Sequence, residues 1–141
     1  MSVRDQNLET IAPVMASFKI HQTAGVDDLK DQQIGQPVLL TGNYEIGPVT
    51  NGGQLLGKLI SLTLTDADTG KRWATVQIGG ICKFAISATN PVVGNRVVGG
   101  TSGTVKQAPV LAAFDPAGGN IARGTVIAVN GTTDCTVLLN S

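Results

Sequence analysis

The chain has 141 residues, and its ten basic and ten acidic residues cancel to a formal net charge of zero. This length provides about one domain with a sizeable core, and only 14% of residues are charged, without the clustered Lys and Arg that attract nucleic acid. No apolar stretch approaches the roughly 18 residues needed to span a bilayer. We therefore expect neither nucleic acid nor a membrane as partner, and the weakly charged surface favours association with other protein.

The first 34 residues differ in composition from the remainder. They contain one glycine, whereas residues 35–141 contain the other seventeen. The first ten residues carry three charged side chains and lack a signal-peptide core, so we expect a protein made and used without export. We predict an extended N-terminal arm over residues 1–34, either a partly ordered tail or a segment that orders by docking on a neighbouring subunit. Its candidate partner contacts are four apolar side chains near helical spacing: Leu8, Ile11, Met15 and Phe18. Pro13 lies among them and makes a long helix unfavourable.

From Pro37 onward, short apolar or alternating runs are separated by turn-forming residues. Alternation is clearest where Ile60, Leu62 and Leu64 share one face, and Asp66–Lys71 reads as the following hairpin connection. Predicted strands cover residues 38–40, 60–65, 73–78, 81–87, 96–98, 125–129 and 135–139. Several short strands at close spacing predict an all-β fold, a small β-barrel or sandwich of antiparallel strands over residues 35–141.

The two cysteines have no metal-type spacing. Cys82 shares a strand face with Phe84 and Ile86, and Cys135 shares one with Val137 and Leu139. Both are therefore predicted to be buried thiols of the core rather than a disulfide or metal ligands.

Three local patterns partly resemble catalytic, metal-binding or phosphate-binding motifs. The histidine His21 has no adjacent residue to hold it as a base or ligand, so we interpret it as a solvated surface residue. Asp66-x-Asp68-x-Gly70 opens like a calcium loop but lacks the later ligands and is better explained as a turn. The segment Gly94–Thr101 differs by one residue from the phosphate-binding loop motif, because Gly100 occupies the position where that motif requires a phosphate-contacting lysine. We predict no catalytic residue, metal or cofactor, and no enzyme.

Trp73 falls on the presumed outer face of its strand, beside Thr75 and Gln77. An exposed tryptophan is a candidate interface anchor because such residues dominate binding energies. Cover by a loop of the same chain is the competing interpretation.

The order of motifs from residue 35 onward resembles that of the small β-barrel decoration, or cement, proteins of tailed-phage capsids. The shared motifs are Gly35-Gln36-Pro37-Val38-Leu39, Leu56-Gly57-Lys58-Leu59, the turn Asp66–Gly70, the strand pair 74–78 and 81–86, the turn Val93-Gly94-Asn95-Arg96-Val97, and the closing run Gly124–Val129. Asn95 replaces the family's Asp, a change that preserves the turn because either residue can form it. The resemblance covers roughly the last three-quarters of the chain.

This resemblance implies a structural virion protein on the outer surface of the capsid, made in the host cytoplasm. It implies a homo-oligomer, commonly a trimer, whose decoration domain is residues 35–141 and whose partner is the major capsid protein. Residues 1–34 lie outside the resemblance and are the candidate capsid-docking arm. The alternative is a phage tail or fibre-associated β-module that binds a surface glycan or another virion protein, with Trp73 and Tyr44 beginning an aromatic platform.

Overall fold

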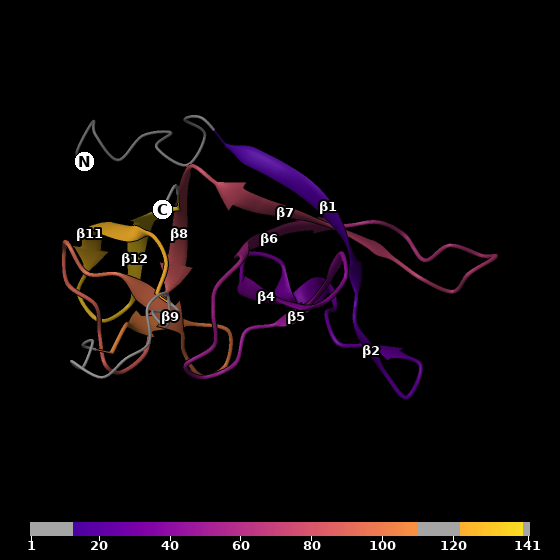
Figure 1. Ribbon diagram of the computed structural model, residues 1–141, viewed down its shortest axis with the longest axis horizontal. Helices are drawn as coiled ribbons and strands as arrows, with labels where there is room; N and C mark the ends of the chain where they lie inside the picture. Colours follow the sequence, from indigo (N-terminus) through magenta and orange to yellow (C-terminus); the bar gives the residue numbers. More distant parts are fainter. Residues whose placement is uncertain (1–12, 110–121, 140–141) are drawn as a thin grey trace.

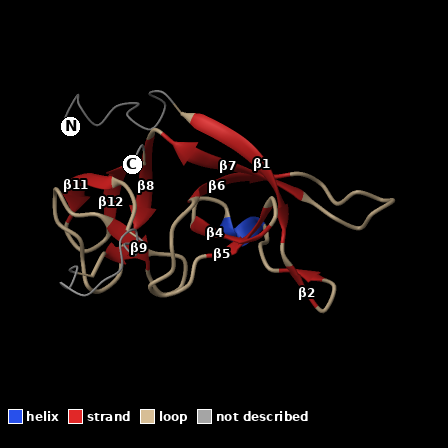
Figure 2. Cartoon of the chain, in the orientation of Figure 1, coloured by secondary structure: helices blue, strands red, loops and turns tan. Residues whose placement is uncertain are grey.

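The computed structural model describes residues 13–109 and 122–139, and this part of the chain is all-β, as predicted (Figure 1 and Figure 2). Within it, no helix has the length and apolar character to cross a bilayer. The elements in chain order are β1 (Val14–Ile20), β2 (Gln22–Thr23), β3 (Val26–Asp27), the 3-10 turn η3 (Asp31–Gln33), β4 (Pro37–Gly42), β5 (Glu45–Pro48), β6 (Gly57–Leu62), β7 (Trp73–Gly79), β8 (Ile81–Ala85), β9 (Val97–Gly99), β10 (Val105–Gln107), β11 (Thr125–Asn130) and β12 (Asp134–Leu138).

The N-terminal half folds into a closed five-stranded barrel with the strand order β1-β5-β4-β6-β7. Neighbouring strands are antiparallel except β1 and β5, which run parallel where they close the barrel. Alternate side chains of each strand point inward, so mostly β-branched and aliphatic residues fill the interior. This first core consists of Ile20, Leu29, Val38, Ile46, Leu59, Ala74 and Val76.

The strand β1 corrects the boundary that we predicted at residue 34. It pairs with β7 from Val14 to Lys19, so this part of the predicted arm is a wall of the barrel. Phe18 packs against the first core and Ile20 is buried within it, whereas Met15 lies on the outer face. Their helix-like spacing was accidental, because residues 15 and 18 fall on opposite faces of a strand. The arm remains a prediction for residues 1–12, which lie outside the described residues.

A bulge in β6 shifts the alternation that we predicted there. The register with β7 slips between Leu59 and Ser61, and Leu59 is the buried residue. A bulge sets two residues against one and so reverses which side chains face inward beyond it. The strand also ends at Leu62, so Leu64 lies beyond it and is 89% exposed. The predicted hairpin connection is confirmed, since the Asp66 N–H donates to the Lys71 carbonyl at 2.9 Å.

The C-terminal half forms a three-stranded sheet, β11-β12-β8, beside the two-stranded β9–β10 pair (Figure 1). The final hairpin of β11 and β12 is as predicted. The predicted strands 73–78 and 81–87 belong to different sheets, because β7 stays in the barrel and β8 pairs with β12. The Gly79–Gly80 turn between them redirects the chain from one sheet to the other.

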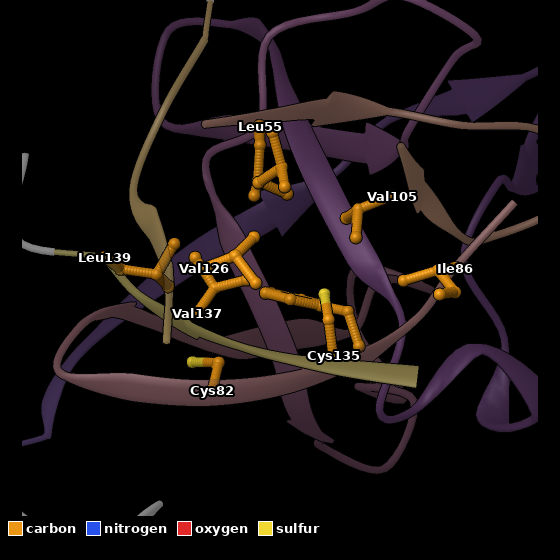
Figure 3. Close-up of a cluster of buried hydrophobic side chains, with 10 residues drawn as sticks. Leu55, Cys82, Ile86, Val105, Val126, Cys135, Val137 and Leu139 are labelled. Atoms are coloured by element: carbon orange, nitrogen blue, oxygen red, sulfur yellow. The ribbon is translucent and has the colours of Figure 1, made fainter. Parts of the chain in front are cut away.

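A second apolar core lies within this half and includes both cysteines (Figure 3). Cys82 and Cys135 form no disulfide and are at most 1% exposed, which confirms that they are buried. Burial raises the pKa of Cys135 to about 12, so this thiol is protonated and unreactive at neutral pH. The core consists of Leu55, Cys82, Phe84, Ile86, Val97, Val105, Val126, Cys135, Val137 and Leu139.

Arg123 joins the two halves. Its guanidinium donates to the carbonyl oxygens of Leu56, just before β6, and Ile78, in β7. A further hydrogen bond of 3.2 Å reaches the carbonyl of Leu139, just after β12. Desolvation by burial lowers the pKa of Arg123, but guanidinium remains charged in proteins. One planar cation therefore connects the barrel to the C-terminal sheet.

Candidate functional site

The structure separates the residues that we predicted as contacts. Leu8 and Ile11 lie outside the described residues. Met15 is 46% exposed on the outer face of β1, while Phe18 is half-buried against the first core. Met15 is therefore available to a partner, and Phe18 chiefly stabilises the barrel.

One edge of β1 is open over most of its length. β7 lies along one side, but on the other side only Lys19 and Ile20 pair with β5. The Lys19 N–H donates toward that second side, to the Tyr44 carbonyl at 2.7 Å. Because main-chain groups alternate along a strand, the N–H groups of Met15 and Ser17 point to the same, open side. Within the described residues no strand covers this edge, which also carries exposed Val14.

Trp73 begins β7 on the outer face, as predicted, and is 47% exposed. It lies directly opposite Lys19 in the β1–β7 register, so the two side chains are neighbours. Both line a cavity of about 510 Å³ between the end of β1, the start of β5 and the β6–β7 loop. Glu45 and Asp66 contribute carboxylates to the same cavity. Trp73 thus borders a hollow lined by polar groups and is only partly covered by its own chain.

The basic side chains of this cavity differ in how they are held. Arg72 is fixed by hydrogen bonds to Asp31 at 2.7 Å and to the Thr63 carbonyl at 2.6 Å. Within the described residues, neither Lys19 nor Lys71 forms an ion pair. Two ammonium groups without an ion pair there therefore line the cavity, together with the held guanidinium of Arg72 and the His21 ring.

The acidic side chains retain spare acceptor capacity. One oxygen of Glu45 accepts from the Thr41 hydroxyl at 3.0 Å. One oxygen of Asp66 accepts from the Asp68 N–H at 2.7 Å, which is the Asx turn favoured by our interpretation of this loop. Among residues 13–109 and 122–139 no group of three or more His, Cys, Asp or Glu is placed to hold a metal ion.

The Gly94–Thr101 stretch forms β9 and the turn that leads toward β10. The Gly100 N–H donates to the Thr104 carbonyl at 2.7 Å, so it belongs to that turn. The arrangement is strand and turn, without the helix that a phosphate loop opens.

His21 has a partner that sequence reasoning missed. Its Nδ1 lies 2.6 Å from Asp28 Oδ2, and the Thr23 hydroxyl donates to the other carboxylate oxygen at 2.8 Å. The β2–β3 hairpin folds the chain back and brings these residues together. The hydrogen bond raises the pKa of His21 and lowers the pKa of Asp28. The signal available in the sequence was the turn-forming Ala24-Gly25 pair between the two residues.

The pKa shifts of His21 and Asp28 define the pH range in which this pair stabilises the fold. A raised His pKa contributes fully below the ordinary value of about 6.5 and is lost as pH rises through the folded-state pKa. A lowered Asp pKa contributes above about 3.9 and is lost as pH falls through the folded-state pKa. The pair therefore contributes most between these two values, and only weakly, because solvent screens exposed pairs.

His21 is expected to titrate above the ordinary histidine pKa. It is the chain's one histidine, so its ring protons give an unambiguous NMR titration. Asp28→Asn should move the pKa back toward the ordinary value, because the hydrogen-bonded carboxylate is lost. Asp27→Asn is the matched control, since Asp27 accepts from Gln22 instead. Equal midpoints in wild type and Asp28→Asn would contradict the pairing.

The described residues thus offer two candidate surfaces, the open edge of β1 and the cavity beside Trp73. The first suits pairing with another chain, and the second suits a small polar ligand. Neither protein-family models, nor curated proteins, nor solved structures yield a match to this chain.

Proposed function

We propose that this chain is a structural virion protein that binds the outside of a tailed-phage capsid and stabilises the head by bridging major capsid subunits. The observation that carries the proposal is the open edge of β1, where no strand of the described residues pairs beside exposed Val14 and Met15. The ordered family-like motifs support the choice of partner. They occupy strands and turns of both halves of the fold.

An open strand edge binds an extended segment by strand addition, in which main-chain hydrogen bonds provide affinity and alternate side chains provide specificity. On β1, Met15 and Ser17 face outward and would contact the side chains next to them on the added strand. Phe18 holds β1 itself against the core of the barrel. The candidate contacts Leu8 and Ile11 precede this edge in the sequence and would extend the same interface.

Bridging stabilises a head because separating two capsid subunits then also exposes the surface buried by the decoration protein. A standard interface buries roughly 1,600 Å² in total, and a closed trimer repeats it three times, so weak contacts add through effective concentration. We further propose that the protein is a homotrimer, that it is made in the host cytoplasm and that it lies on the exterior of the capsid.

Binding to undecorated heads tests this function. Wild-type protein is expected to co-sediment with heads and to raise their thermal disruption temperature. Ser17→Pro should weaken binding at least tenfold, because proline removes an N–H on the open edge, where strands tolerate it. Met15→Lys should weaken binding similarly by placing a charge in an apolar contact.

Two controls make this result specific. Ser17→Ala retains the edge N–H, and Leu64→Lys adds a charge at an exposed site in the β6–β7 loop, outside the open edge of β1. Both should bind like wild type. Failure of the wild-type protein to bind heads would overturn the function, and a strictly monomeric state in analytical ultracentrifugation would overturn the trimer. Undiminished binding by Ser17→Pro and Met15→Lys would overturn the use of this edge.

A further inference from the structure

We propose that the cavity beside Trp73 binds a carboxylate-bearing sugar residue. This site is separate from the open edge of β1, so the inference goes beyond capsid binding and does not depend on it. It would give the assembled protein a second surface, directed toward an acidic glycan.

The indole of Trp73 supplies the apolar wall of the site. It is half-exposed at the margin of a cavity of about 510 Å³, within the roughly 300–1,000 Å³ typical of small-ligand sites. The face of an aromatic ring carries partial negative charge, and the C–H groups of a sugar carry partial positive charge. A pyranose ring stacked on Trp73 would therefore bury its apolar face and leave its hydroxyls toward the polar walls.

The charges around the cavity favour a single carboxylate. Lys19 and Lys71 line it without ion-pair partners in the described residues, so either ammonium is available to an anion. Arg72 adds positive potential but is already held by Asp31 and the Thr63 carbonyl. An exposed carboxylate that reaches these lysines replaces water with charge-assisted hydrogen bonds.

The two carboxylates of the cavity favour hydroxyls and disfavour phosphate. Glu45 and Asp66 each use one oxygen within the protein, which leaves the second oxygen to accept from a ligand hydroxyl. A phosphate carries up to two negative charges and would be repelled by both acids, whereas a sugar acid carries one charge and several donors. The lining therefore fits a uronic-acid type of sugar better than a nucleotide or phosphorylated sugar.

Three sugars that share the same pyranose ring, but differ in the group attached to it, test this assignment. Methyl β-glucuronide, methyl β-glucoside and glucose 6-phosphate present a carboxylate, a hydroxymethyl and a phosphate at the same carbon. With purified full-length protein and no heads present, NMR titration of the Trp73 indole signal should show the tightest binding for the glucuronide. The glucoside and the phosphate should each bind at least tenfold more weakly.

Variants then assign the residues. The double variant Lys19→Gln with Lys71→Gln should abolish the preference for glucuronide over glucoside, because it removes both ammonium groups that line the cavity. Trp73→Ala should abolish binding of both sugars, measured by calorimetry, with circular dichroism as the folding check. Lys83→Gln, at an exposed position of β8, is the matched control and should behave as wild type.

Equal affinity for glucuronide and glucoside, tighter binding of the phosphate, or no glucuronide binding by the wild type would each overturn the inference. A double variant, Lys19→Gln with Lys71→Gln, that keeps the preference would overturn the role of the cavity, even if Trp73→Ala failed to fold. Head binding can fail while glucuronide binding succeeds, and the reverse, so the two proposals are distinguishable.

Discussion

Replacement of Arg123 by methionine should lower the free energy of unfolding by about 3 kcal/mol or more. The guanidinium serves three carbonyl oxygens, those of Leu56, Ile78 and Leu139. A buried acceptor that loses its donor costs about 1–3 kcal/mol, and methionine keeps a long apolar stem but no donor. Loss of the hydrogen bonds, rather than loss of packing, is therefore the main cause. Urea unfolding followed by circular dichroism measures the change.

The same substitution should also loosen the connection between the two halves. Each half has its own apolar core, and Arg123 donates to carbonyls on both sides of their junction. Arg123→Lys keeps the charge but replaces a planar fork by a point donor, so it should fall between wild type and Arg123→Met. Broadened or two-step unfolding would accompany the loss, because the halves would no longer unfold as one unit.

Two other basic residues serve as controls for Arg123. Within the described residues Arg96 donates one side-chain hydrogen bond, to the Ala122 carbonyl at 3.1 Å, so Arg96→Gln should cost only about 1 kcal/mol. Lys83 is exposed on β8, and Lys83→Gln should change stability by less than about 0.5 kcal/mol. An Arg123→Met protein as stable as the Lys83→Gln control would contradict the joining role.

The fold class could be predicted from the sequence where alternation was long and turns were strong. The β11–β12 hairpin combines a clear alternation with an Asn-Gly turn, and both cysteines followed from the same periodicity. β1 was missed because its apolar residues satisfy two periods at once. Ser17 and Lys19 alternate with Phe18 and Ile20 as in a strand, but Met15 and Phe18 also fit a helix.

The cavity could not be predicted, because its residues come from segments that meet only when the barrel closes. Lys19 and Glu45 are adjacent through the parallel β1–β5 pairing, and Trp73 reaches them through the β1–β7 register. Pairing partners of this kind are set by tertiary packing rather than by local pattern. The exposure of Trp73 was predictable from its strand face, but the polar walls opposite it were not.

Replacement of Gly57 by alanine should be strongly destabilising, by about 3 kcal/mol or more, at the upper end of overpacking costs. Gly57 begins β6 inside the barrel, and a Cβ atom built there would overlap the main-chain carbonyl of Gln77 in β7. The β7 backbone at that point cannot move aside easily. Gln77 pairs with both Lys58 and Met15, and its side-chain amide donates to the Gly79 carbonyl at 3.1 Å.

Gly35→Ala is the control that distinguishes destabilisation by steric overlap from destabilisation by a positive φ angle. Gly35 has a φ of +94° but nothing within 4 Å of an added Cβ, so its cost should be only the left-handed penalty of about 1–2 kcal/mol. Gly57 has no such φ, and alanine there would otherwise gain about 0.4–1 kcal/mol from a less flexible unfolded chain. Denaturant midpoints should therefore fall in the order wild type, Gly35→Ala, Gly57→Ala. The reverse order would mean that β6 and β7 do not approach this closely, since only their proximity makes Gly57 the more sensitive position.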